Sequence, residues 1–242
     1  MSPDERPWSS VPIALGATFA LLLAAQIVWH GGRSSSGPDT RVELPPAPRA
    51  VALRLAAFGE DAAMARLAML YLQSFDLRGG SAIPYHRLDY DRLVAWLGAI
   101  LETDPRSAYP LFAAARVYAE SPDPAKSRVA LDFVYREYLK SPNTRWPWLA
   151  HAALLAKHRL RDLALARRYA AAIDRDTTDP SVPSWARQME IFILEDMDEL
   201  EAAKIMLGGL LASGRITDPA EAKFLRERLE QLEDRLRNSR PR

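Results

Sequence analysis

The chain has 242 residues, 48% of them hydrophobic and 26% charged, which is enough for one domain with a core and for further segments beside it. Its 32 basic and 31 acidic side chains nearly cancel and form no basic face of the kind that nucleic-acid-binding proteins carry, so we expect no nucleic-acid partner. The absence of cysteine excludes disulfides, thiolate metal sites and cysteine nucleophiles. Abundant alanine, leucine, arginine and glutamate predict an all-α fold.

Residues 11–29 form an uncharged apolar run that predicts a transmembrane helix after a short tail over residues 1–10. At about 1.5 Å per residue this run spans about 28 Å, close to the thickness of the hydrocarbon core of a bilayer. Trp8 and Trp29 flank it, as aromatic residues do at membrane interfaces. A buried core helix and a cleaved signal peptide are the alternatives. The run exceeds the usual length of a signal peptide's apolar region, about 7–15 residues, and no small-x-small motif follows it, which favours a retained single-pass anchor.

Residues 30–48 are rich in glycine, serine and proline and predict a flexible linker. The basic residues on the two flanks of the apolar run do not by themselves decide its orientation. Because the N-terminal tail is very short, we expect the anchor to lie in the inner (cytoplasmic) membrane and the remaining chain to be exported to the periplasm.

Apolar triplets at positions i, i+4 and i+7 recur every 37 residues and would each lie on one face of a helix. They are Leu111/Ala115/Tyr118, Trp148/Ala152/Leu155 and Trp185/Met189/Phe192, and Met64/Ala68/Tyr71 fits the same template 47 residues upstream. A second helix is predicted after each of the three, because Ala130, Ala166 and Ala202 recur every 36 residues with Phe133, Tyr169 and Ile205 three positions later. This register places Trp148 and Trp185 in the core, where replacement by alanine would destabilise the fold by about 3–5 kcal/mol.

The large–small–large pattern of the first helix, the small residue early in the second and the proline at its exit resemble the tetratricopeptide repeat (TPR) family. Residues 93–120 resemble it most, and the resemblance covers about 61–212, some four units longer than the family's usual 34 residues. It implies an α-solenoid of about four helix–turn–helix units within a domain over residues 49–218. Other α-solenoid families and an unrelated helical bundle are the alternatives.

Residues 219–242 predict a C-terminal capping helix followed by a basic tail. One apolar stripe faces a charged remainder, as expected of a helix that covers the last unit of a solenoid; its members are Phe224, Leu225, Leu229, Leu232 and Leu236. The leucine spacing also fits a short coiled-coil seam, which would make this helix an oligomerisation module that joins copies of the chain.

The sequence contains no glycine-rich phosphate loop and no motif of a metallohydrolase or serine hydrolase. His151 and His158 share a predicted helix but lie about 10 Å apart along it, too far for two histidines alone to hold a metal ion. We therefore expect no catalytic residue, no metal and no cofactor, and a protein that is not an enzyme.

An insertion over residues 76–88 separates the two helices of the first unit and carries Tyr85, His86 and Arg87. Long connections in compact domains are more often functional than short ones. One hypothesis is that this insertion holds a ligand or catalytic site of an accessory subunit; the alternative is a tolerated surface insertion.

The TPR resemblance also implies a groove lined by the first helix of each unit, where partner proteins bind. The matching positions are Tyr109, Phe112, Arg116, Trp146, Leu149, Lys157 and Glu190. Aromatic and apolar side chains among mixed charges suit a peptide, a loop or another helix. The expected function is a membrane-tethered scaffold for protein–protein interactions in a bacterial envelope complex that supports assembly, secretion or translocation.

Overall fold

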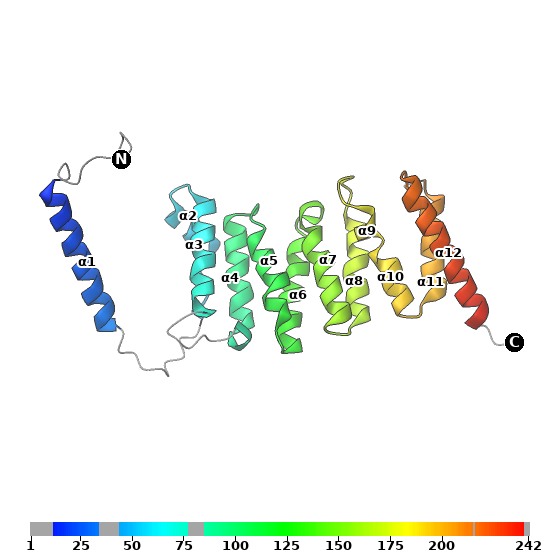
Figure 1. The fold of residues 1–242 in the computed structure, drawn as a ribbon, viewed down its shortest axis with the longest axis horizontal. Helices are drawn as coiled ribbons and strands as arrows, with labels where there is room; N and C mark the ends of the chain where they lie inside the picture. The colour runs from blue at the N-terminus through cyan, green and yellow to red at the C-terminus, as the bar shows by residue number, and fades with distance from the viewer. Residues whose placement is uncertain (1–11, 34–43, 77–84, 215, 240–242) are drawn as a thin grey trace, which may run out of the picture. The chain divides into compact units, whose positions relative to one another are not determined.

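The computed structural model describes residues 12–33, 44–76, 85–214 and 216–239, and all regular elements in these ranges are helical (Figure 1). The predicted all-α class is therefore confirmed for this part of the chain. Internal contacts divide the chain into two units. The first contains α1 (Ile13–Arg33), and the second contains the other helices. The predicted N-terminal and basic C-terminal tails lie outside the described ranges.

The predicted transmembrane anchor over residues 11–29 is wrong. Within the ranges that the structure describes, no helix combines the length and the apolar character that crossing a membrane requires. Residues 13–29 of α1 cover only about 25 Å at about 1.5 Å per residue, short of a hydrocarbon core of about 30 Å. Past Trp29 the helix continues through His30, two glycines and Arg33, which are not apolar. The inner-membrane localisation, which rested on this anchor, is overturned with it.

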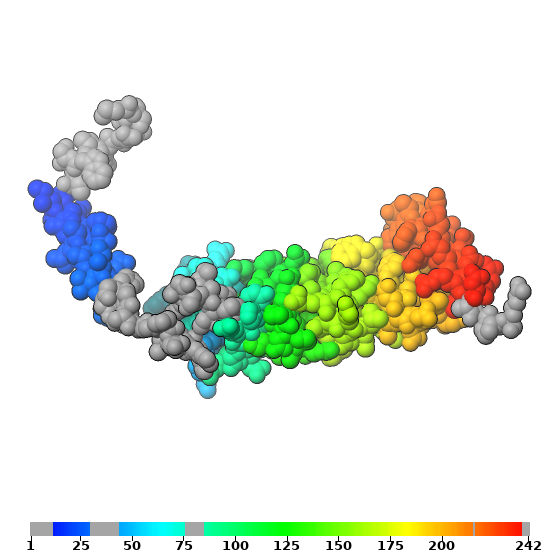
Figure 2. All heavy atoms as spheres, turned by 60° about the horizontal axis from the view of Figure 1, so that its bottom comes forward, coloured from blue at the N-terminus to red at the C-terminus, as the bar shows by residue number. Residues whose placement is uncertain are grey.

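The second unit is a row of helices in which each contacts its next one or two neighbours along the chain. In Figure 2 the colours of this unit accordingly follow one another in bands from cyan to red. The helices are α2 (Ala50–Ala57), α3 (Asp61–Gln73), α4 (Tyr90–Thr103), α5 (Tyr109–Arg116), α6 (Pro124–Tyr138), α7 (Pro142–His158), α8 (Leu163–Asp176), α9 (Ser184–Arg187), α10 (Met189–Asp196), α11 (Leu200–Ala212) and α12 (Pro219–Ser239). Such sequential contacts are the arrangement of a repeat array.

From α3 to α11 the helices pair into successive hairpins. We call α3, α5, α7 and the pair α9–α10 the first helices of these hairpins, and α4, α6, α8 and α11 the second helices. The 3-10 turn η5 (Tyr118–Glu120) extends α5 before α6 begins. Within each hairpin the first helix packs against the second, as the expected helix–turn–helix units require.

The predicted core register holds in α5 but slips by one residue in α7. Leu111, Ala115 and Tyr118 are buried as expected. In α7 the fully buried triplet consists of Leu149, Ala153 and Ala156. Of the expected triplet Ala152 is also fully buried, whereas Trp148 and Leu155 are only partly buried. The same slip leaves Trp185 54% exposed beside the fully buried Ala186. Because α7 is apolar on several sides, its sequence offers two equivalent triplets and does not select between them.

The second helices show a similar displacement in the last hairpin. Ala166 is fully buried, but in α11 the buried residue is Ala203 and not the expected Ala202, while Ile205 is 72% exposed. Arg161 and Asp198, in the turns before α8 and α11, have positive φ angles of 52° and 61°. Ala166 and Ala203 each lie five residues after these turn residues, so the hairpin turns set a repeat of 37 residues here.

The leucines of α12 pack against the last hairpin. Leu225 and Leu232 are buried together with Leu200 and Leu207 of α11, and the remaining two leucines of the stripe lie against the same cluster. Arg228 Nε on α12 donates at 3.0 Å to the buried carboxylate of Glu195 on α10. The leucine stripe is thus covered by the chain itself, as a capping helix requires, which leaves it unavailable as a seam between copies.

Aspartate residues cap the second helices of three hairpins. Asp89, Asp123 and Asp162 precede α4, α6 and α8, and each accepts a hydrogen bond of 2.9 Å from a backbone N–H in the first turn of its helix. The bond from the Leu165 N–H and the nearby Arg128 guanidinium hold the pKa of the Asp162 carboxyl below its ordinary value of 3.8. An ionised capping aspartate also interacts favourably with the helix dipole.

Replacing Asp162 with alanine is expected to lower the free energy of unfolding by about 1 kcal/mol at neutral pH. Because the folded-state pKa is depressed, the charge-dependent part of this stability is present above the ordinary pKa and disappears as the pH falls through the folded-state pKa. Urea unfolding is measured at neutral pH and at about pH 2. The difference in free energy of unfolding between the wild type and Asp162→Ala should be smaller at the acidic pH. Asp162→Asn, which retains a capping oxygen, is the matched control; an unchanged Asp162→Ala difference in acid would contradict the charged cap.

Candidate functional site

Five partly exposed aromatic side chains connect successive first helices, and we call them the aromatic stripe. They are Tyr109 and Phe112 on α5, Trp146 and Trp148 on α7, and Trp185 on α9. The ring centroids of Tyr109 and Phe112 lie 6.2 Å apart, those of Phe112 and Trp148 5.9 Å, and those of Trp146 and Trp185 5.5 Å. Tyr109 is 40% exposed and Phe112 41%. The stripe therefore presents aromatic surface across three neighbouring first helices.

The spacing of the two tryptophans in α7 explains how the stripe crosses from helix to helix. Residues two positions apart on an α-helix project about 200° apart around its axis, so their side chains reach towards different neighbours. Trp148 contacts Phe112 of the preceding first helix, and Trp146 contacts Trp185 of the following one. At the other end Gln73 Nε2 of α3 donates to the Tyr109 hydroxyl at 2.5 Å. Side-chain contacts thus join all the first helices from α3 to α9.

A cleft of about 570 Å³ opens beside the stripe, and Trp148 lines it. Its other walls come from the turn over residues 105–108, from Leu111 of α5 and from the turn between α6 and α7. The charged residues Glu102 of α4, Arg106 and Lys140 also line this cleft. The cleft therefore combines apolar and charged surface next to the aromatic stripe.

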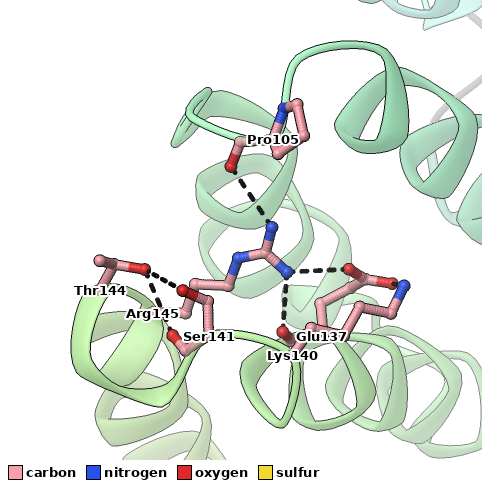
Figure 3. Close-up of polar contacts among 6 residues, drawn as sticks. All are labelled: Pro105, Glu137, Lys140, Ser141, Thr144 and Arg145. Carbon is pink, nitrogen blue, oxygen red and sulfur yellow. Dashed lines mark hydrogen bonds and ion pairs between the residues drawn. The ribbon is translucent and has the colours of Figure 1, made fainter.

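Arg145 fixes one wall of this cleft (Figure 3). The buried guanidinium donates from Nη1 to the Glu137 carbonyl at 2.8 Å and to Glu137 Oε2 at 3.0 Å, and from Nη2 to the Pro105 carbonyl at 3.4 Å. Lys140 Nζ donates to the other carboxylate oxygen of Glu137 at 2.6 Å. Both Glu137 carboxylate oxygens are thus occupied, and Arg145 ties the start of the third hairpin to the end of the second and to the turn between the first and the second. This contact holds the first turns of α7 in place and so positions the tryptophans that follow.

The structure brings only part of the predicted groove together. Tyr109, Phe112 and Trp146 belong to the aromatic stripe. Leu149 is fully buried in the core, because the register of α7 is one residue from the expected one. Glu190 is buried and pairs at 3.0 Å with Arg167 of α8.

The two remaining basic residues of the predicted groove lie near the ends of their helices. Lys157 of α7 pairs with Asp196 of α10, which ties neighbouring first helices together. Arg116 is exposed at the end of α5. Burial lowers the pKa of the neighbouring His151, and the positive charge of Arg116 lowers it further. This region therefore favours a neutral imidazole. In the part of the chain that the structure describes, no group of three residues could hold a metal ion.

The second half of the insertion is attached to the second hairpin. Residues 77–84 lie outside the described ranges, whereas Tyr85–Arg87 form the 3-10 turn η4. The Tyr85 ring packs against Tyr118 at 6.4 Å, and Lys126 Nζ donates to the His86 carbonyl at 2.7 Å. These contacts use the Tyr85 ring and the backbone of His86 to anchor the insertion. Arg87 is exposed.

The predicted groove did not include Trp148 and Trp185, which we expected in the core. A signal for them exists in the sequence: Phe112, Trp148 and Trp185 are aromatic residues spaced by 36 and 37 residues. At a spacing close to the repeat length, such residues occupy equivalent sites on adjacent helices. Periodicity alone does not say whether that row faces the core or the solvent.

No protein-family model matches this chain, and no curated protein or solved structure is similar to it at a significant level. The functional argument therefore depends on the geometry of the site.

Proposed function

We propose that the second unit is a TPR-like scaffold without catalytic activity that binds a segment of a partner protein along the aromatic stripe. The observation that supports this proposal is the set of ring contacts between neighbouring first helices, in which Phe112 meets Trp148 and Trp146 meets Trp185 and all four rings remain partly exposed. Monomeric proteins rarely leave large adjoining apolar side chains exposed without a binding role. Aromatic side chains are also the most frequent energetic anchors of protein interfaces.

The shape and chemistry of the stripe favour a peptide or an amphipathic helix as the bound segment. Rigid rings offer a large contact area and lose little conformational entropy on binding. The cleft beside Trp148 adds charged groups that could bind the polar edge of the same segment. A segment with spaced apolar or aromatic side chains would place them against the rings and its polar side chains against this cleft.

The proposal is tested with short peptides selected from a random displayed library for binding to the whole chain. We expect Phe112→Ala and Trp185→Ala each to weaken the affinity of the selected peptides by about 10-fold to 100-fold, as measured by fluorescence polarisation, since each removes an anchor worth about 1.4–2.8 kcal/mol. Ile205→Ala is the matched control, because Ile205 is a large exposed apolar residue on a second helix, away from the stripe.

Both stripe variants are expected to remain folded, since Phe112 and Trp185 are 41% and 54% exposed. Circular dichroism and thermal unfolding check this. Equal loss of affinity in Ile205→Ala, or no loss in either stripe variant, would remove the stripe as the binding surface. A photo-crosslinking residue at position 112 should label bound peptide more strongly than one at position 205.

A further inference from the structure

A cavity of about 550 Å³ lies where the last hairpin meets the capping helix α12, and no residue of the aromatic stripe lines it. Its walls come from the end of α8, the segment over residues 180–183, α9, α10, the second half of α11 and the start of α12. Sites that bind small molecules usually enclose about 300–1,000 Å³. The largest apolar side chains of the lining are Val182, Ile191, Met206, Leu210 and Ile216. The cavity therefore offers an apolar interior of the size that a small ligand requires.

Gly209 keeps part of this cavity open. It lies inside α11, where glycine is less favourable than alanine because it has more conformational freedom to lose on folding. Close packing does not require it, since a Cβ atom at this position would meet no atom of another helix within 4 Å. The missing side chain instead leaves space in the cavity wall. A residue that is unfavourable for the helix and unnecessary for its packing is consistent with space kept for a ligand.

Arg187 of α9 is the only basic residue among the described residues that line the cavity. Its Nη2 donates to the Asp179 carbonyl at 2.5 Å, which holds the guanidinium against the preceding loop, but its Nε is buried without a hydrogen-bond partner. The Asp179 carboxylate accepts from the Ser181 N–H at 2.8 Å; this bond and, to a smaller extent, the Arg187 charge hold the pKa of the Asp179 carboxyl below its ordinary value. A buried N–H donor without an acceptor is unfavourable, so a ligand that brings an acceptor oxygen to this guanidinium would bind favourably.

The two acidic residues of the lining already have partners. Glu221 of α12 accepts a hydrogen bond from Gln188 Nε2, and Asp174 of α8 also takes part in an interaction of its own. A carboxylate is the complementary group for a guanidinium, because it only accepts hydrogen bonds and carries the opposite charge. The lining therefore favours a ligand with a carboxylate at one end and apolar atoms over the rest of its surface.

From the cavity and its unsatisfied guanidinium we infer that this site binds a small carboxylic acid with an apolar body. The carboxylate accepts hydrogen bonds from Arg187, and the apolar body fills the space beside Gly209 and the aliphatic walls. A bound acid would contact the last hairpin and α12 together and so tie the capping helix to the array. The inference concerns a site separate from the aromatic stripe, goes beyond the proposed function and does not depend on it.

The test titrates the whole chain with two probes of this class, 3-phenylpropionate and octanoate, by isothermal titration calorimetry. We expect each acid to bind and to raise the midpoint of thermal unfolding, since a ligand that binds only the folded state stabilises it. The matched amides, 3-phenylpropanamide and octanamide, should bind at least about 10-fold more weakly, because they lack the charge that Arg187 binds. The matched amine, 3-phenylpropylamine, should not bind detectably.

Variants assign the binding to the cavity. Arg187→Met should weaken the affinity for both acids by about 10-fold to 100-fold and leave the weak affinity for the amides unchanged. Gly209→Leu should block the acids and the amides alike, because its side chain fills the cavity. Gly208→Leu is the matched control, since position 208 lies in the same helix, has equal room for a side chain and does not line the cavity. Circular dichroism checks that the variants remain folded.

N-acetylphenylalanine distinguishes the two sources of this chemistry: tighter binding than that of 3-phenylpropionate would indicate the last residue of a peptide, and weaker binding a free acid. No binding of either acid at millimolar concentration would overturn the inference. Equal affinity for acids and amides would also overturn it, as would tighter binding of the amine, which would give the choice of ligand charge to Glu221 and Asp174. An equal loss of binding in Gly208→Leu and Gly209→Leu would place the bound acid outside the cavity and contradict the inference as well.

Discussion

Replacing Tyr169 with alanine is expected to lower the free energy of unfolding by about 3–5 kcal/mol, the range for a large aromatic side chain removed from a core. Tyr169 of α8 is fully buried, its ring lies 5.3 Å from that of Tyr135, and its hydroxyl donates to Asp132 Oδ1 at 3.2 Å. Burial raises the pKa of this hydroxyl above its ordinary value, and the Asp132 charge raises it further. Chemical denaturation monitored by circular dichroism measures the loss.

Trp185→Ala is the matched comparison, since it removes a larger aromatic side chain that is 54% exposed. Its free energy of unfolding should change by less than about 1 kcal/mol, as expected for a surface position. The register expected from spacing places Trp185 in the core, so both variants would then lose about 3–5 kcal/mol in free energy of unfolding. Equal destabilisation by Tyr169→Ala and Trp185→Ala would therefore contradict the observed register of the repeats.

Replacing Arg145 with methionine is expected to destabilise the fold by about 3 kcal/mol, because it leaves the buried Glu137 carboxylate without its buried cationic partner. We expect the lower end of the range for a broken buried ion pair, since the half-exposed Lys140 still contacts the other carboxylate oxygen. Loss of the bond to the Pro105 carbonyl also frees the turn that lines the cleft. Urea unfolding of the purified chain gives the magnitude.

The double variant Arg145→Met/Glu137→Leu is the control for the charge. Replacing both partners of a buried ion pair with apolar residues of similar size is often neutral or stabilising, so the double variant should recover most of the stability lost in Arg145→Met. If the double variant instead loses the sum of the stabilities lost in Arg145→Met and in Glu137→Leu, the ion pair does not couple these residues. The role of Arg145 would then be limited to its bonds with backbone carbonyls.

Local signals in the sequence were sufficient to predict successive helical hairpins. The structure shows that Pro142 begins α7, where its missing N–H costs nothing, and that Asp162 caps α8. Such signals act between residues a few positions apart, so they need no knowledge of the remaining chain. The leucines of α12 likewise predicted a covering helix, because one apolar stripe opposite a charged face has a single stable placement on the last hairpin.

Part of the candidate site could be predicted in the same way. Tyr109, Phe112 and Trp146 were expected in a groove, and they lie in the aromatic stripe. Leu149 and Glu190 were expected beside them but are buried against other helices. A shift of one residue rotates a helix face by about 100°, so a small error in repeat length moves a residue from the surface to the core.

By itself the sequence determined that this chain forms successive α-helical hairpins closed by a capping helix, since helix propensity, caps and turn residues all act locally. Only the tertiary structure decided which side of α7 is buried, that Trp148 is only partly buried and that Trp185 is exposed. It also showed that α2 and α3 end the row with an apolar surface. The physical reason is that an apolar side chain favours burial on any neighbour that fits, and the geometry of packing between helices selects which neighbour it meets.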